Sequence, residues 1–117
     1  MKVYLSLPIS GYDEKERREF AARTCGYLNY EHEDWEIVNP FHVGDRLRRE
    51  RLEKGDFSLP SYDEYMREDI RVLRGCDMAL FCQGWHVSDG CVEEMRECWW
   101  HGVKVGFVGE DGRVWVS

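Results

Sequence analysis

The sequence predicts a single α/β domain over residues 1–117, Rossmann-like or flavodoxin-like, with a mostly parallel sheet of about five strands and helices on both faces. Short apolar runs alternate with segments of helical periodicity, which favours parallel strands joined by right-handed helical crossovers. The run at residues 77–82 is continuously apolar, as is typical of a central parallel strand. The length fits one domain and not two.

Apolar runs bounded by turn residues are interpreted as strands, at residues 3–7, 35–38, 77–82, 103–108 and 114–116. The last run follows a Glu110-Asp111-Gly112 turn and is expected to be a short antiparallel edge strand. In open parallel sheets, ligands bind beyond the carboxyl ends of the strands. The segments expected there are residues 8–13, 39–41 and 83–90.

Helices are predicted between the strands, over residues 13–30, 61–75 and 89–100. Two of them begin at capping boxes, formed by Asp13 with Glu16 and by Ser61 with Glu64. Gly102 follows the third helix, where glycine commonly ends a helix.

Residues 41–60 are charged and are expected to be irregular, apart from one helical turn at residues 46–52. Four arginines between residues 46 and 51 suggest a phosphate-binding lid or a segment contributed across a subunit interface of a homodimer or higher homo-oligomer. A solvated helix with Arg–Glu pairs explains the same residues equally well.

Composition excludes several classes of protein. The net charge of −7 disfavours binding to duplex nucleic acid. There is no apolar run of transmembrane length and no signal peptide, so no membrane partner is expected. Five cysteines without a CxxC pair suggest thiols in a reducing cytoplasm. The four histidines show no metal-ligand spacing, and neither a metal nor another cofactor is expected.

An acid lies within the apolar stripe of the helix predicted at residues 61–75. The stripe is defined by Tyr62, Met66, Leu73 and Cys76, and Asp69 falls inside it. A buried acid needs a partner or a function, because burying it unpaired is costly. Asp69 is therefore a candidate site residue, although pairing with a backbone group or an arginine would also explain it.

The helix at residues 89–100 shows a related pattern. Its expected inner face consists of Cys91, Val92, Met95, Cys98 and Trp99, with Glu94 at the edge of that face. The helix dipole would favour an ionised Glu94 near the amino end, as a carboxylate nucleophile requires, but acids are common at helix starts in any case. Ser88 and Gly90 open this helix and suit either an anion site or a simple N-cap.

Three stretches of the chain resemble the nucleoside 2-deoxyribosyltransferase superfamily. They are VYLSLPISG at the start, YMREDIRVLRGCDMALF from residue 65, and GWHVSDGCVEEMRECWWHG from residue 84. Within that superfamily the chain resembles a branch of small, often phage-borne proteins of unassigned function. The shared pattern also includes Asn39-Pro40 and leaves out residues 42–60.

The resemblance implies a retaining double displacement at an N-glycosidic bond. Glu94 corresponds to the family's nucleophile, Asp69 to its helix acid, and Tyr4 to the strand tyrosine that contacts the nucleophile. Glu94 would form a glycosyl ester, while Asp69 would protonate the leaving base and then activate water or an acceptor base. Retaining glycosidases divide these roles between two carboxyl groups in the same way.

The resemblance further implies a nucleoside or nucleotide substrate. Ser88 occupies the position at which relatives acting on 5′-monophosphates carry serine, whereas the charge of Asp89 would repel a phosphate. Ser10 and Gly11 in the first loop are expected to contact the substrate, and Phe41 and Trp85 are candidates to stack on the base. The alternatives are a glycohydrolase on another nucleotide such as NAD, and a non-catalytic nucleotide-binding module.

Overall fold

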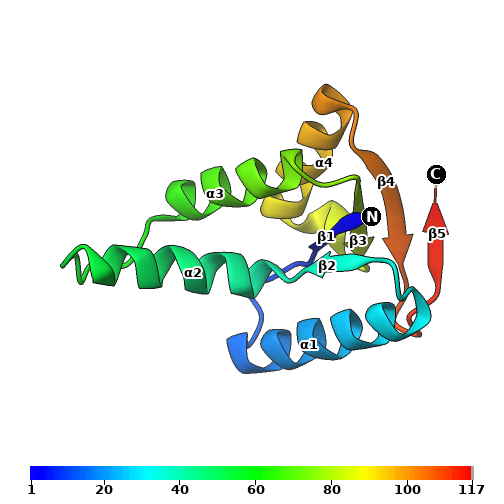
Figure 1. Cartoon of the computed structure of the whole chain (residues 1–117), viewed down its shortest axis with the longest axis horizontal. Coiled ribbons are helices and arrows are strands. Elements are labelled where there is room, and N and C mark those ends of the chain that lie inside the picture. The colour runs from blue at the N-terminus through cyan, green and yellow to red at the C-terminus, as the bar shows by residue number, and fades with distance from the viewer. Residues whose placement is uncertain (117) are drawn as a thin grey trace.

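A computed structural model of the chain describes residues 1–116 and contains one five-stranded sheet in the order β2-β1-β3-β4-β5 (Figure 1). The strands are β1 (Lys2–Ser6), β2 (Glu36–Val38), β3 (Met78–Cys82), β4 (Lys104–Val108) and β5 (Val114–Val116). The first four are parallel, and β5 pairs antiparallel with β4 at the edge. The predicted fold class and the antiparallel edge strand are therefore confirmed.

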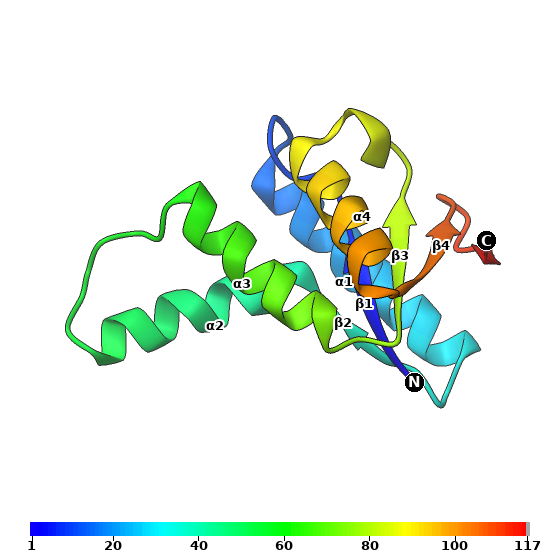
Figure 2. The same ribbon diagram turned by 90° about the horizontal axis from the view of Figure 1, so that it is seen from above.

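The helices cover both faces of this sheet. They are α1 (Glu14–Glu31), α2 (Pro40–Glu53), α3 (Tyr62–Arg74) and α4 (Asp89–His101), with a short 3-10 turn η1 (Trp85–Val87) before α4. α1 packs on one face, and α3 and α4 pack on the other. α2 lies along α3, and this helical pair extends away from the sheet (Figure 2).

Alternate side chains of β1 point to opposite faces of the sheet and so join two different cores. Val3 and Leu5 join the core beneath α1, whereas Tyr4 faces the core beneath α3 and α4. Ser6, two residues after Tyr4, is completely buried. β1 and β3 are neighbours from which the chain leaves toward opposite edges of the sheet, so their carboxyl ends form the switch point at which open α/β sheets bind ligands.

Two of the predicted helix ends are confirmed, and one is confirmed in part. The capping box of Ser61 and Glu64 is complete, and Gly102 ends α4 in the left-handed conformation. Asp13 caps α1 by accepting from the Lys15 amide, but Glu16 binds the guanidinium of the adjacent Arg17. That charge-assisted pair competes successfully with the weaker backbone contact of a capping box.

The prediction of an irregular segment at residues 41–60 is wrong over most of its length, because α2 is a helix of 14 residues. Asn39 caps it and Pro40 occupies its first turn, which is a helix-start signal as well as a strand-end signal. Only its amino end is buried, at Pro40, Phe41 and Val43. The helix therefore lacks the long apolar stripe by which helices are predicted from sequence.

Gly106 on β4 allows β5 to approach closely. A Cβ atom there would lie 2.8 Å from Leu80 Cδ2 and 2.9 Å from the Trp115 carbonyl oxygen. We expect Gly106→Ala to lower the free energy of unfolding by about 1–3 kcal/mol through overpacking. Denaturant unfolding should show this loss, whereas Gly26→Ala, in open space on α1, should be neutral or slightly stabilising. Equal stability of the two variants would contradict the packing argument.

Candidate functional site

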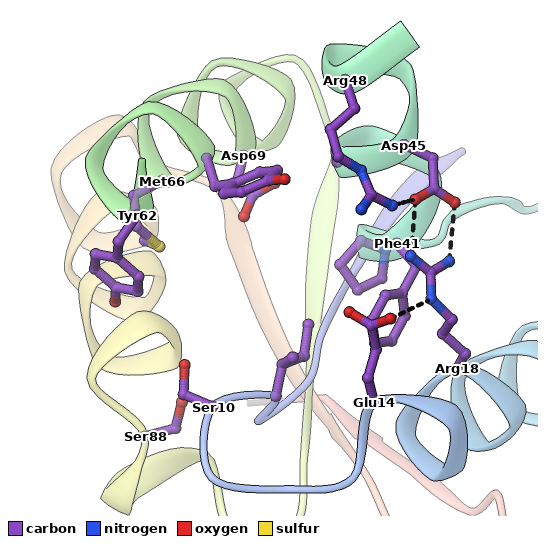
Figure 3. Close-up of a pocket in the computed structure, with 14 residues that line it drawn as sticks. Ser10, Glu14, Arg18, Phe41, Asp45, Arg48, Tyr62, Met66, Asp69 and Ser88 are labelled. Carbon is purple, nitrogen blue, oxygen red and sulfur yellow. Dashed lines mark hydrogen bonds and ion pairs between the residues drawn. The ribbon is translucent and has the colours of Figure 1, made fainter. Parts of the chain in front are cut away.

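A cavity of about 250 Å³ lies at the carboxyl end of β1, as the switch-point rule predicts (Figure 3). Its walls come from the loop after β1, from α1, from α2 and from α3, and Ser88 borders it at the start of α4. Segments far apart in the sequence thus enclose one space. Within residues 1–116 it combines aromatic walls with acidic, basic and hydroxyl groups, as expected of a small-molecule site.

Glu94 is buried, with 6% of its surface exposed, and it is not part of the wall of this cavity. The Ser6 hydroxyl donates a hydrogen bond of 2.9 Å to Glu94 Oε1. Within residues 1–116, the other oxygen, Oε2, and the buried Tyr4 hydroxyl have no hydrogen-bond partner of ordinary geometry. One carboxylate oxygen of Glu94 is therefore held by a hydrogen bond, and the other has no hydrogen bond of ordinary geometry within residues 1–116.

Burial raises the pKa of Glu94 to about 7, although the neighbouring Tyr4 and Ser6 hydroxyls act in the opposite direction. The pKa of Tyr4 is raised well above its ordinary value, first by burial and then by the charge of Glu94. The Tyr4 hydroxyl therefore keeps its proton and remains a potential donor to Glu94. These contacts agree with the predicted neighbourhood of Tyr4 and Glu94.

Asp69 lines the cavity from α3, next to Met66 and across from α2 (Figure 3). Its pKa is raised to about 8, first by burial, then by the charge of Glu94 and then by that of Glu68. The wheel-based prediction that Asp69 faces inward agrees with this position. Asp69 and Glu94 come from different helices and interact electrostatically, and both carboxyl groups titrate near neutral pH.

The predicted inner face of α4 needs correction. Trp99 was expected there, but 82% of its surface is exposed. The buried residues of α4 are Cys91, Glu94 and Cys98, so Glu94 lies in the middle of the inner face and not at its edge. Glu94 also lies in the second turn, where the helix dipole contributes little. The Ser6 hydroxyl stabilises the ionised form of Glu94 in place of the dipole.

Three of the predicted substrate-binding residues, Ser10, Phe41 and Ser88, line the cavity. Ser10 and Ser88 also border an adjoining cavity of about 210 Å³, in which Gly90 and Asp89 take part. Gly11, at φ 86°, forms the turn of the first loop and is not part of either wall.

Trp85 is not brought to this site. It packs against Phe81 and Phe107, with ring centroids 5.7 Å and 5.9 Å away, over the core beneath α4. Ser88 caps α4 by accepting from the Cys91 amide at 3.4 Å. The N-cap interpretation of Ser88 is thus confirmed, and its place on the cavity wall leaves its hydroxyl available to a ligand.

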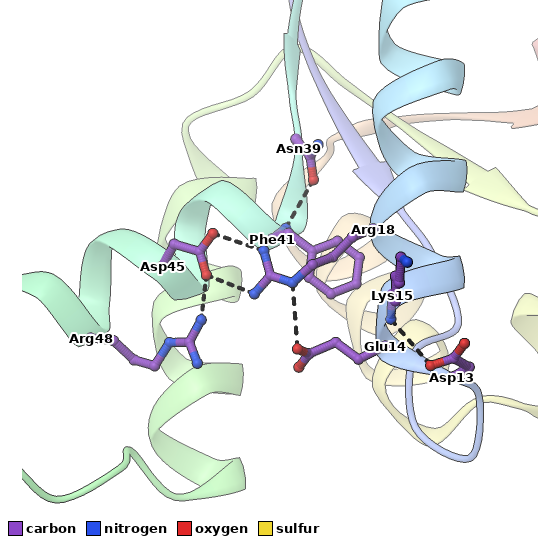
Figure 4. A network of polar contacts seen from close by, with 8 residues as sticks. All are labelled: Asp13, Glu14, Lys15, Arg18, Asn39, Phe41, Asp45 and Arg48. Atoms are coloured by element: carbon purple, nitrogen blue, oxygen red, sulfur yellow. Dashed lines mark hydrogen bonds and ion pairs between the residues drawn. The ribbon is translucent and has the colours of Figure 1, made fainter.

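Two features of the site were not found in the sequence. Ser6 could have been found, because it lies two residues after Tyr4 on the same strand face. The other feature is an ion-pair network of Arg18, Asp45 and Arg48, which also lines the cavity (Figure 4). Asp45 and Arg48 are three residues apart on α2, a helical spacing that the sequence offers, whereas Arg18 comes from α1 and no spacing links it to them.

The other paired arginines of the 46–51 segment are neutralised by nearby acids. Arg46 pairs with Glu50 and Glu68, and Arg51 pairs with Glu64 and Asp56. The interpretation of this segment as a surface helix with Arg–Glu pairs is confirmed for these residues. Only Arg48 of the segment reaches the cavity.

Residues 1–106 match the family model described as Domain of unknown function (DUF4406). The chain belongs to this family. No curated protein and no solved structure matches it. Among residues 1–116, no helix has the length and apolar character needed to cross a membrane, and no three His, Cys, Asp or Glu side chains are grouped to hold a metal ion.

The raised pKa of Asp69 predicts a stability that depends on pH. A carboxyl group whose pKa rises on folding from 3.8 to about 8 costs no stability at low pH, where it is protonated in both states, and destabilises the folded state progressively as the pH rises from about 4 to about 8. We therefore expect Asp69→Asn to raise the melting temperature relative to the wild type at pH 9 and to change it little at pH 4. Thermal unfolding at both pH values measures this.

Asp63→Asn provides the control, because Asp63 is exposed on the same helix. Asp63→Asn should show no increase in melting temperature, relative to the wild type, that grows with pH. If Asp69→Asn destabilised the protein more at pH 9 than at pH 4, the Asp69 carboxyl would be stabilised as an anion, contrary to its position in the site.

Proposed function

We propose that this protein cleaves or exchanges the N-glycosidic bond of a nucleoside or nucleoside 5′-monophosphate through a covalent glycosyl ester on Glu94. The observation that carries the proposal is the buried Glu94, whose Oε1 accepts a hydrogen bond from Ser6 while Oε2 has no partner of ordinary geometry among residues 1–116, together with its electrostatic interaction with Asp69 on the cavity wall. A nucleophile and an acid held near one cavity are the requirement for a retaining mechanism.

In the first step, Glu94 Oε2 attacks the anomeric carbon of the sugar. A carbon–oxygen bond forms, the carbon–nitrogen bond to the base breaks, and its electron pair remains on the base nitrogen. Asp69 transfers its proton to the base, which leaves as a neutral molecule. The hydrogen bond from Ser6 to Oε1 restricts the orientation of the carboxylate and leaves Oε2 as the attacking oxygen.

In the second step, water or a second base attacks the anomeric carbon and displaces Glu94. The Asp69 carboxylate accepts the proton from the attacking group, which restores both acids to their starting states. With pKa values of about 7 for Glu94 and about 8 for Asp69, the pair can hold one proton near neutral pH, with Glu94 ionised and Asp69 protonated.

The adjoining cavity suits the 5′ end of the sugar. Ser10 and Ser88 border both cavities, and Gly90 lies beyond them in the first turn of α4. The amides of a helix start favour a phosphate there. Asp89 borders the same cavity and disfavours a dianion, so a free 5′-hydroxyl and a 5′-phosphate are both candidates.

Replacement of the nucleophile tests the proposal. Glu94→Gln keeps the size of the side chain but removes its charge, and we expect base release to fall by at least about a thousandfold, as loss of a nucleophile does in other enzymes. The assay follows free base by chromatography, with nucleosides, 5′-monophosphates and NAD as substrates, each with and without an acceptor base. The acceptor distinguishes transfer from hydrolysis.

Glu93→Gln is the matched control, since Glu93 is exposed and pairs with Arg96 on the outer side of the same helix. It should retain activity, and circular dichroism should show both variants folded. Activity in Glu94→Gln with loss in Glu93→Gln would contradict the assignment. Tight nucleotide binding by the wild type without base release would favour a binding module.

The two raised pKa values predict a bell-shaped pH profile. The rate constant kcat/KM should rise as Glu94 ionises through about pH 7 and fall as Asp69 loses its proton through about pH 8. Asp69→Asn should lower kcat/KM and remove the alkaline limb. A wild-type profile that rises steadily from pH 5 to pH 10 would contradict a protonated Asp69 as the general acid.

A further inference from the structure

The ion-pair network on the α2 side of the cavity is organised around Asp45 (Figure 4). Arg18 donates two hydrogen bonds to Asp45, of 2.9 Å and 2.8 Å, and its Nε lies 3.5 Å from Glu14. The Arg18 guanidinium also lies 4.7 Å from the centre of the Phe41 ring. Each of the three guanidinium nitrogens of Arg18 thus has an acidic partner, so Arg18 holds Asp45 and Phe41 in place.

Arg48 differs from Arg18 in having unused donors. It bonds to Asp45 through Nη2 alone and has no other ion-pair or hydrogen-bond partner within residues 1–116. Arg48 nevertheless lines the cavity, and 37% of its side chain is exposed. Asp45 holds the guanidinium at one nitrogen, and the remaining N–H groups are available to a ligand in the cavity.

We propose that Arg48 binds an exocyclic oxo group of the nucleobase, with Asp45 and Arg18 as positioning residues and Phe41 as a wall for the base. This inference rests on the proposed function for the orientation of the substrate. If Ser10 and Ser88 hold the sugar and Asp69 protonates the base, the base extends toward α2, because α2 forms the opposite wall (Figure 3).

The charges of the network favour a neutral acceptor over a phosphate. Arg18 and Arg48 contribute two positive charges, and Glu14 and Asp45 contribute two negative charges, which gives a net charge of zero. The pKa of Asp45 is lowered to about 2, first by its hydrogen bond from Arg18, so Asp45 stays ionised at neutral pH. A carbonyl oxygen gains a directed hydrogen bond here, whereas a dianion finds no excess positive charge.

The experiment compares bases that carry an oxo group, hypoxanthine and uracil, with adenine, which carries none. Binding of each free base to the full chain is measured by calorimetry. We expect at least one oxo base to bind more tightly than adenine. Arg48→Met should weaken binding of that oxo base roughly ten- to a hundredfold, in line with the discrimination that arginine gives against a mismatched base, while adenine changes less than about twofold.

Arg49→Met is the matched control, because Arg49 is the exposed neighbour on α2 and is not part of the cavity wall. It should bind all three bases as the wild type does. The inference is overturned if no oxo base is preferred, if Arg48→Met binds oxo bases like the wild type, or if Arg48→Met weakens binding of inorganic phosphate but not of the bases. The last result would make Arg48 a phosphate contact.

Base binding and base release separate this inference from the proposed function. The wild type could bind oxo bases through Arg48 and yet release no base from any substrate. That result would sustain the inference and contradict the proposed function. Alternatively, base release could depend on Glu94 but be as fast for 2′-deoxyadenosine as for 2′-deoxyinosine, in the wild type and in Arg48→Met alike. That result would sustain the proposed function and contradict the inference.

Discussion

The structure of the site depends on two carboxyl groups withdrawn from water, a buried one at Glu94 and a half-buried one at Asp69. Ser6, the last residue of β1, binds Glu94, and Asp69 on α3 lines the cavity and interacts electrostatically with Glu94. Removing a carboxylate from water is costly, and the raised pKa values of both acids express that cost. Tyr4 and Ser6 reduce the cost of ionising Glu94 through their hydroxyl groups. Both hydroxyls lie on the same face of the sheet, because side chains two residues apart on a strand point to the same side.

The fold was predictable because its strands are short apolar runs separated by helices and turn residues. β5 was predicted from a turn and a run of three residues, and both it and its antiparallel pairing were found. The prediction failed at α2, which is stabilised by its cap and by ion pairs and not by an apolar stripe. It also failed at Trp99, since an apolar residue at helical spacing indicates burial only where another element covers it.

The candidate site was predictable only in part, for reasons that differ between its residues. Asp69 was noticed because an acid interrupted an apolar helix face, and Glu94 because it lay beside one; both signals depend on a single helix. Arg48 was one of four arginines of the 46–51 segment that suggested a phosphate site, but nothing in the sequence separated it from the other three, because Arg18 reaches Asp45 from a different helix. Tertiary pairing between Arg18 and Asp45 has no fixed sequence spacing, so the sequence suggested Phe41 and the 46–51 arginines separately and only the structure joined them through Arg18.

The cost of the two acids also bears on the choice between a catalyst and a binding module. A site that only bound a neutral nucleoside could use Asn and Gln at positions 69 and 94, since amides fill the same space and form hydrogen bonds without titrating. Acids there destabilise the folded state increasingly as the pH rises. Such a cost is commonly found where a site needs charge or proton transfer, which a double displacement requires of both residues. The α2 network, with a net charge of zero, brings no excess positive charge that would lower these pKa values, and it leaves the acids near the neutral range in which the proposed chemistry operates.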